Sequence, residues 1–317
     1  MILVTGGAGY IGSHFVLACQ DAGLPCVVLD DLSTGNRASV PPGVPFVRGD
    51  IADAEVLRRL FRDWSVTAVV HLAASISVPE SIAAPELYWS NNAAKTLALL
   101  SACRAQGVEQ VVFASTAAVY GMPATDHVFE TDRPQPISPY GRSKLASEWL
   151  LEDLSRAGMM RTASLRFFNV AGSDPTGRAR GGAPTARHLI AEVRRVAMGE
   201  RSHLEIYGVD YDTRDGTCIR DFIHVTDLCR ALLVSHRALA EGRSGLTLNV
   251  GTGTGISVGE IVAAASGYLG RALPQVIQGR RPGDIPSLVA EAGRLKEFGW
   301  IPQHSAPEDI IRTALAA

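Results

Sequence analysis

MILVTGGAGYIG, residues 1–12, opens the chain and decides its fold. Its first five residues form an apolar run typical of a buried strand, and a helical pattern begins at Ile11. Glycines between the two are spaced Gly6-x-x-Gly9-x-x-Gly12. In a strand–turn–helix unit such glycines let the backbone approach a pyrophosphate, to which the helix presents free N–H groups. The stretch predicts a dinucleotide site at Gly6, Gly9, Tyr10, Ile11 and Gly12, with a plain glycine-rich turn as the alternative.

Short apolar runs alternate with helical patterns up to Gly172. Several runs are continuously apolar, which is typical of parallel strands covered on both faces. The alternation predicts an α/β fold with a doubly wound, Rossmann-like parallel sheet. The predicted strands are Ile2–Thr5, Cys26–Asp30, Pro45–Arg48, Ala68–His71, Gln110–Ser115 and Thr162–Phe167, and the predicted helices are Ile11–Ala22, Ala54–Asp63, Asn91–Ala105 and Ser143–Ala157.

The composition changes after Gly172, where Ser173–Pro184 is rich in Gly, Pro and Arg. We expect residues 1–172 to form the dinucleotide-binding domain, with a return segment at about 225–251. Residues 173–317 are expected to form a smaller, interleaved α/β domain for the substrate. Its predicted elements are helix Thr185–Met198, loop Tyr207–Gly216, helix Val225–Ala240, strand Leu246–Val250, and polar loops with short helices over Gly279–Ala317.

The composition excludes several classes of function. The 317 residues carry a net charge of −2, so no basic surface for nucleic acid or membrane lipids is indicated. No apolar run approaches the roughly 20 residues of a membrane helix, and Met1 leads straight into a strand without a signal-peptide pattern. Five scattered cysteines favour the reducing cytoplasm, and the histidines show no metal-binding spacing, so we expect no metal.

Acidic residues at strand ends indicate which dinucleotide binds. Asp30 ends the second predicted strand, and Asp31 follows it directly. A carboxylate there accepts hydrogen bonds from both ribose hydroxyls and repels a 2′-phosphate, which favours NAD over NADP. Asp50 ends the third strand, where it either reaches the adenine amine or is the N-cap of the next helix.

Tyr140 and Lys144 form the predicted catalytic pair. Ser138-Pro139 is a helix start, which places these two residues four positions apart on one helical face. A phenol has a pKa of about 10, and a neighbouring ammonium lowers that pKa by stabilising the phenolate. Ser115 and Thr116 end an apolar strand at the edge where ligands bind, so a hydroxyl there can relay the proton to Tyr140. A β-branched residue that merely suits a strand is the alternative for Thr116.

These residues resemble a known family, the extended short-chain dehydrogenase/reductases, and within it the sugar-nucleotide 4-epimerases. The resemblance covers essentially the whole chain. Its most specific piece is YGVDYDTRDGTCIRDFIHV, residues 207–225. The other matching strings are GGAGYIGSH (6–14), DDLSTG (30–35), HLAA (71–74), NN (91–92), STAAVYG (115–121), RFFNVAG (166–172) and RPGD (281–284).

The resemblance implies an isomerase of galactose metabolism that interconverts UDP-galactose and UDP-glucose with tightly bound NAD. In such enzymes the residue at Tyr140 takes the proton of the sugar 4′-hydroxyl, helped by Thr116, while the C4 hydride passes to the nicotinamide. The 4-keto sugar then turns and takes the hydride back on its other face. A homodimer through helices Asn91–Ala105 and Ser143–Ala157 is also implied.

The resemblance further implies which residues bind each ligand. The UDP anchor must be strong because the sugar turns while UDP stays fixed, and Arg220 and Arg281 suit its diphosphate. Beyond the glycine loop and Asp30, Asp31 and Asp50, the implied cofactor residues are Ser33, Thr34, Gly35, Ile51, Leu72, Ala73, Ala74, Asn91, Ser115, Tyr140, Lys144 and Phe167. The implied substrate residues are Thr116, Tyr140, Asn169, His188, Leu189, Tyr207, Arg220, Arg281, Asp284 and Leu288.

The chain departs from the family pattern at three positions. Ile76 stands where some epimerases have a phosphate-binding lysine, and His188 where the family has an asparagine near the uridine. Leu288 occupies the position that limits sugar size, where stricter enzymes have tyrosine. N-acetylated UDP-sugars therefore stay open as alternative substrates. UDP-glucuronate stays open as well, because its epimerase needs only an extra group to hold the carboxylate.

The sequence also bears on three other functions. Nucleotide-sugar dehydratases and decarboxylases place acidic residues directly after the catalytic threonine, because elimination needs an additional acid or base. Ala117 and Ala118 stand there in this chain and argue against both. A dinucleotide-sensing protein without enzymatic activity is disfavoured by the Tyr140–Lys144 pair.

Overall fold

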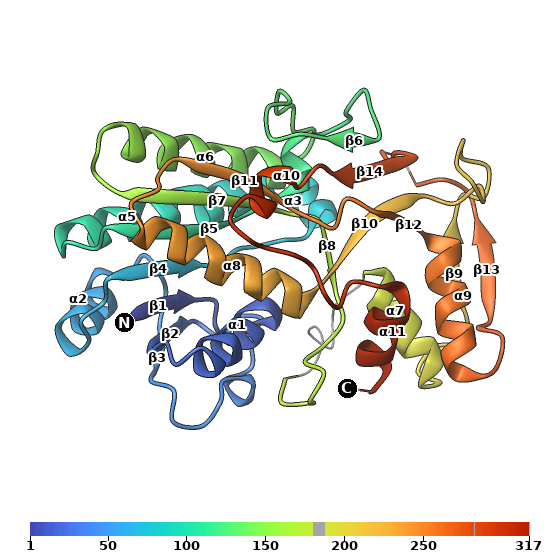
Figure 1. Cartoon of the computed structure of the whole chain (residues 1–317), viewed down its shortest axis with the longest axis horizontal. Helices are drawn as coiled ribbons and strands as arrows, with labels where there is room; N and C mark the ends of the chain where they lie inside the picture. Colours follow the sequence, from blue (N-terminus) through green and yellow to red (C-terminus); the bar gives the residue numbers. More distant parts are fainter. Residues whose placement is uncertain (180–187, 282, 317) are drawn as a thin grey trace.

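Seven parallel strands form the central sheet of the computed structural model, which describes residues 1–179, 188–281 and 283–316. Their order is β11-β7-β5-β4-β1-β2-β3, with β1 in the interior and sequence-distant β11 at one edge (Figure 1). This is the doubly wound, Rossmann-like sheet that the sequence predicts. The strands are β1 (Ile2–Thr5), β2 (Cys26–Asp30), β3 (Phe46–Arg48), β4 (Ala68–His71), β5 (Gln110–Thr116), β7 (Arg161–Phe167) and β11 (Leu246–Val250).

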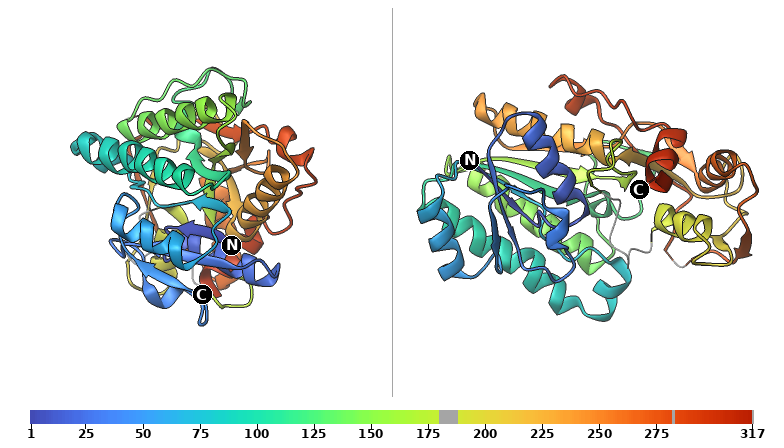
Figure 2. Two further views of the ribbon diagram at one scale, coloured as in Figure 1. Left: turned by 90° about the vertical axis from the view of Figure 1, so that its left-hand side faces the viewer. Right: turned by 90° about the horizontal axis from the view of Figure 1, so that it is seen from below.

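Helices cover both faces of this sheet (Figures 1 and 2). Successive residues of β1 enter different cores, since Val4 packs with α1 and α8 whereas Leu3 packs with α2, α5 and α6. All four residues of β1 and all five of β2 are buried, which explains the continuous apolar runs. These helices are α1 (Tyr10–Asp21), α8 (Val225–Ala240), α2 (Ala54–Asp63), α5 (Lys95–Ala105) and α6 (Pro139–Arg156).

The helix predicted over Asn91–Ala105 is two elements. Residues Trp89–Ala94 form a π-helical turn, η2, and α5 continues from Lys95. The helix that bears Tyr140 begins as predicted, with Ser138 as N-cap accepting a hydrogen bond from Gly141 and Pro139 in its first turn. Short helices α3 (Val78–Ala83) and α4 (Pro85–Tyr88), which the sequence did not indicate, lead into η2.

A second lobe, built mainly from residues after Phe168, lies beyond the carboxyl ends of the main-sheet strands (Figure 1). Strand β10 pairs in parallel with β8 and β14 and antiparallel with β12, and β14 pairs with β6. A separate pair, β9 with β13, lies beyond them. The strands are β6 (His127–Val128), β8 (Asn169–Ala171), β9 (Leu204–Tyr207), β10 (Ile219–His224), β12 (Gly255–Ser257), β13 (Gln275–Gln278) and β14 (Ser287–Ala290).

Helices of the described part of this lobe are α7 (Leu189–Ala197), α9 (Val258–Leu269) and α11 (Pro307–Ala316), whereas α10 (Gly293–Lys296) packs on β11 of the main sheet. For α7, residues 185–187 of the predicted helix lie outside the described residues, as do residues 180–184 of the predicted loop Ser173–Pro184. Helix α9 was missed, although Ser257 and Glu260 form a complete capping box at its start. No described helix is long and apolar enough to cross a membrane.

The C-terminal segment is fastened to α8 by buried polar groups. Asp227 is fully buried, and its carboxylate accepts hydrogen bonds from the backbone of Gln303 and His304 and from the Ser305 hydroxyl. The Trp300 indole donates to the Asp227 carbonyl at 2.9 Å and packs in the same core as α1 and α8. This segment therefore stabilises the half of the molecule that contains the seven-stranded sheet.

Replacing Trp300 with alanine removes the largest fully buried side chain and leaves a cavity under α8. We expect Trp300→Ala to lower the free energy of unfolding by about 3–5 kcal/mol. Denaturant unfolding followed by circular dichroism measures this loss. Tyr268→Ala is the control, since Tyr268 is half exposed, and an equal loss in both variants would contradict the assignment.

Candidate active site

The glycine loop leaves bare backbone at the start of α1. Gly6 has a φ of +70°, and a Cβ atom on Gly12 would lie 2.1 Å from the Gly6 carbonyl oxygen. Gly9 is the N-cap and offers no side chain to the first N–H groups of α1. These free donors and the positive helix end suit a diphosphate, so the loop fits the predicted dinucleotide.

Asp30 ends β2 beside the loop. Its carboxylate accepts hydrogen bonds from the backbone N–H groups of Ala8 at 2.9 Å and Leu32 at 2.8 Å. Burial raises the pKa of Asp30, while these two bonds oppose the rise. Leu32 holds a φ of +62°, which leucine rarely adopts, so the contact constrains the turn. The neighbouring Asp31 instead accepts from the backbone and hydroxyl of Ser33.

Asp50 is not the N-cap of α2. Asp53 has that position and accepts from the backbone of Glu55 and Val56. Asp50 accepts from Ala52 N–H at 2.8 Å and pairs with the Lys95 ammonium. Burial raises the pKa of Asp50, but the bond and charge of Lys95 and the bond from Ala52 together lower it overall. The N-cap interpretation was therefore wrong, and an adenine contact stays a prediction.

The ends of β4 and η2 meet beside the loop. A Cβ on Gly6 would lie 2.7 Å from the Ala73 amide nitrogen, so the backbone of Leu72–Ala74 lies directly against the glycine loop. Asn91 donates to the Ser75 hydroxyl at 3.0 Å, and Asn92 exchanges two bonds with the Ser75 backbone. Ile76 is 72% exposed, so this departure from the family pattern adds no side chain to the interior.

Tyr140, Thr116 and Lys144 come together at the carboxyl edge of the sheet. Thr116 ends β5, accepts a hydrogen bond from the Ala118 amide at 3.2 Å and is hydrogen-bonded to the Tyr140 phenol. The Tyr140 ring meets the edge of the buried Tyr88 ring, with centroids 6.2 Å apart. Burial raises the pKa of Tyr140 and the bond with Thr116 opposes this.

Lys144 is almost fully buried one turn below Tyr140. Its ammonium donates to the Ala114 carbonyl at 2.8 Å and lies 4.7 Å from the centre of the Phe113 ring. Burial lowers the pKa of Lys144 to about 7, against the attraction of Glu148. Its charge is therefore sensitive to nearby groups at neutral pH.

The structure does not bring Ser115 into this cluster. Its hydroxyl donates instead to the buried Glu148 carboxylate, which also binds the Arg166 guanidinium. Adjacent residues of a strand point to opposite faces, so the hydroxyls of Ser115 and Thr116 contact different partners. Neither Glu148 nor Arg166 was predicted from the sequence, although Glu148 stands four residues after Lys144.

The predicted substrate residues of the second lobe form two contacts. The Arg281 guanidinium lies 3.6 Å from the centre of the Tyr207 ring. Arg220 donates to the carbonyls of Ile219 and Ile285 and lies 3.6 Å from the Asp284 carboxylate.

The remaining substrate residues lie on neighbouring elements of the second lobe. Leu288 pairs with Arg220 in the strand register, placing it beside these contacts. His188 is the N-cap of α7, directly before Leu189, and Asn169 begins β8.

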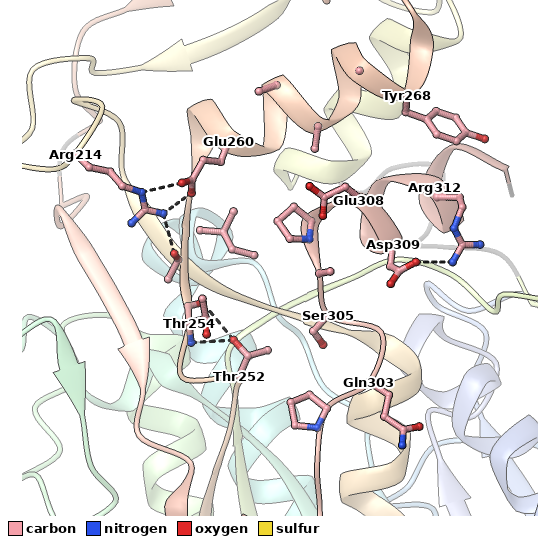
Figure 3. Close-up of a pocket in the computed structure, with 18 residues that line it drawn as sticks. Arg214, Thr252, Thr254, Glu260, Tyr268, Gln303, Ser305, Glu308, Asp309 and Arg312 are labelled. Carbon is pink, nitrogen blue, oxygen red and sulfur yellow. Dashed lines mark hydrogen bonds and ion pairs between the residues drawn. The ribbon is translucent and has the colours of Figure 1, made fainter.

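A cavity of about 1210 Å³ lies elsewhere, between α9 and α11 (Figure 3). Its rim carries the Arg214–Glu260 and Arg312–Asp309 ion pairs. Among the described residues that line it, none is a predicted cofactor, catalytic or substrate residue. The cavity is therefore distinct from the catalytic cluster.

Comparison with known proteins identifies relatives of the chain. Residues 2–251 match the model of the NAD dependent epimerase/dehydratase family. The chain is 49% identical to the UDP-glucose 4-epimerase of Azospirillum brasilense over 316 residues, covering 99% of this chain and 91% of that protein.

Two solved structures share the fold. The Brucella ovis UDP-glucose 4-epimerase in complex with NAD has a TM-score of 0.96 and 41% identity, covering 99% of this chain and 97% of that one. The Thermotoga maritima UDP-glucose 4-epimerase with UDP-glucose has a TM-score of 0.84 and 33% identity, with the same coverage.

A methyl group at Gly12 tests the dinucleotide loop. Gly12→Ala places a Cβ against the Gly6 carbonyl and must shift the loop backbone, so the purified variant should retain much less nicotinamide dinucleotide. Released nucleotide is measured after denaturation. Gly267→Ala in α9 is the control, because a Cβ there meets open space. Equal nucleotide content in both variants would refute the placement.

Proposed function

The chain belongs to the NAD dependent epimerase/dehydratase family, and we propose that it interconverts UDP-galactose and UDP-glucose at carbon 4 of the sugar. The observation that carries this proposal is the cluster of Thr116, Tyr140 and Lys144 at the carboxyl edge of the sheet. Ala117 and Ala118 follow Thr116, so no acid or base for elimination stands beside it. The function is therefore reversible oxidation rather than dehydration.

The residues of the first lobe fit a resident NAD. Gly6, Gly9 and Gly12 leave the start of α1 open to a diphosphate, and Asp30 offers carboxylate oxygens to ribose hydroxyls. When bound, NAD supplies the hydride acceptor that later returns the hydride to the sugar. The remaining proposed cofactor residues are Tyr10, Ile11, Asp31, Ser33, Thr34, Gly35, Asp50, Ile51, Leu72, Ala73, Ala74, Asn91, Lys144 and Phe167.

Tyr140 is the proposed general base. It removes the proton from the sugar 4′-hydroxyl and returns it when the sugar is reduced. Burial raises the pKa of Tyr140, and the hydrogen bond by which Thr116 holds the phenol opposes that rise. The Lys144 ammonium stabilises the phenolate, because an opposite charge favours the ionised form.

The second lobe is the proposed UDP anchor. Arg220 and Arg281 provide forked donors for the diphosphate, and Asp284 accepts from the uridine ribose. Asn169, His188, Leu189, Tyr207 and Leu288 complete the proposed substrate residues. Anchoring only the nucleotide leaves the sugar free to turn between the two hydride transfers.

We also propose a homodimer through α5 and α6, which lie side by side on the outside of the first lobe (Figures 1 and 2). Large apolar side chains are exposed there: Leu97 is 50% exposed and Trp149 is 59% exposed. Trp89, in the adjoining η2, is 44% exposed. Burying such residues against a second copy is favourable.

The proposed compartment is the reducing cytoplasm. All five cysteines are free and buried in the structure, where they pack as small apolar side chains.

The deciding experiment offers UDP-galactose to the purified protein without added NAD and follows UDP-glucose formation. Turnover is expected, because the proposed cofactor stays bound. Tyr140→Phe should retain the nucleotide and lose at least about 100-fold in kcat, since it cannot accept the proton. If the wild type holds NAD yet is inactive, UDP-galactose is the wrong substrate.

The two hydroxyls at the end of β5 should differ in effect. Thr116→Ala removes a hydrogen bond to a charged phenolate, so kcat should fall by about 10- to 100-fold. Ser115→Ala should cost less, because its hydroxyl contacts Glu148 instead. Steady-state kinetics with UDP-galactose measure both, and a larger effect of Ser115→Ala would reverse these roles.

Charge placed on the exposed α6 face should separate the dimer. Trp149→Glu is expected to give a monomer in light scattering at concentrations where the wild type is a dimer, because an unpaired carboxylate would be buried. Tyr268→Glu on α9 is the matched control and should stay dimeric. A dimeric Trp149→Glu would exclude this interface.

A further inference from the structure

We propose that Glu148 is a positioning residue that keeps the ammonium charge on Lys144 and thereby lets Tyr140 ionise. The inference rests on the proposed function for the role of Tyr140, but its test measures the ionisation of Tyr140 and not the turnover of substrate. The three residues stand at intervals of four on α6, so they share one helical face.

Glu148 is held in place from two strands. It is 6% exposed, and its carboxylate accepts the Ser115 hydroxyl from β5. From β7, Arg166 donates through Nη2 at 2.7 Å and through Nε at 3.1 Å. A two-point contact with a guanidinium fixes the position and orientation of the carboxylate.

Arg166 is itself fixed on its other side. Its Nη1 donates to the Tyr120 hydroxyl at 2.9 Å, and Tyr120 donates to Asn249 on β11 at 2.6 Å. Burial lowers the pKa of Arg166, but the bond and charge of Glu148 raise it overall. The network therefore holds an anion behind the catalytic pair with little freedom to move.

Of the described residues that face the pair, His71, Thr116 and Tyr88 do not supply that anion. His71 on β4 faces Lys144, and burial, followed by the charge of Lys144, lowers the pKa of His71 to about 3, so it is neutral. Tyr140 faces Thr116 and Tyr88, whose hydroxyl donates to Glu80 at 2.6 Å. Burial lowers the pKa of Lys144, whereas the charge of Glu148 raises it.

Neutralising Glu148 changes the pH at which Lys144 and Tyr140 each lose a proton. With glutamine at 148, Lys144 and Arg166 are two buried cations without an anion, so Lys144 releases its proton at lower pH. Tyr140 then titrates beside a neutral amine. Its phenolate therefore forms at higher pH, because the attraction of the ammonium is gone.

The test titrates the phenolate of Tyr140 in the NAD-bound protein by ultraviolet absorbance. Subtracting the titration of Tyr140→Phe removes the contribution of the other tyrosines. We expect Glu148→Gln to raise the pKa of Tyr140 by about 1 unit or more, the size of one close charge. Glu148→Asp keeps the charge and should shift the pKa less than Glu148→Gln.

A second variant covers the risk that Glu148→Gln does not fold, since it leaves Arg166 unpaired. Glu148→Gln/Arg166→Gln removes both charges and should still show a raised pKa of Tyr140. An unchanged pKa in a folded variant overturns the proposal, even if activity falls. The pKa of Tyr140 can also rise in the variants while the wild type fails to epimerise UDP-galactose. That result would refute the proposed function but support this inference.

Discussion

Lys144 is buried against the sheet, and much of the candidate site depends on how that charge is held. A desolvated ammonium loses its proton readily, which fits the lowering of its pKa to about 7. The Ala114 carbonyl and Phe113 ring contact it directly, and Glu148 provides the opposing charge. Its location also depends on the parallel sheet, because only there do β5 and the start of α6 meet at one edge.

Buried acids also join the two lobes. Asp221 on β10 is fully buried, and backbone N–H groups of Thr252, Gly253 and Ala290 donate to its carboxylate. Asp227 fastens the C-terminal segment in the same way. Burial raises the pKa of Asp221, while these bonds oppose the rise. Such carboxylates are tolerated because backbone donors satisfy them.

The sequence predicts the first lobe better than the second. Strands β1, β2, β4 and β11 have the predicted bounds, because strands buried on both faces form unbroken apolar runs. Most strands of the second lobe are only three or four residues long, and β13 is wholly exposed, so no periodicity marks them.

For the site, strand order brought Thr116 and Tyr140 together as predicted, but the sequence could not resolve side-chain direction. Ser115 points away, because neighbouring strand residues face opposite sides. Likewise, Asp53 and not Asp50 is the N-cap of α2, because the local turn geometry determines which aspartate lies at the helix start. Arg166 was quoted only as part of a matching string, since its partner Glu148 lies on another element.

The edge position of β11 has a consequence for how the protein is made. Its partner β7 ends at Phe167, yet β11 begins only at Leu246, after much of the second lobe. During synthesis, the first six strands of the sheet therefore emerge from the ribosome well before the seventh is made. Until then, β7 presents an open edge that invites wrong pairing, so chaperone protection of the nascent chain matters most in that interval.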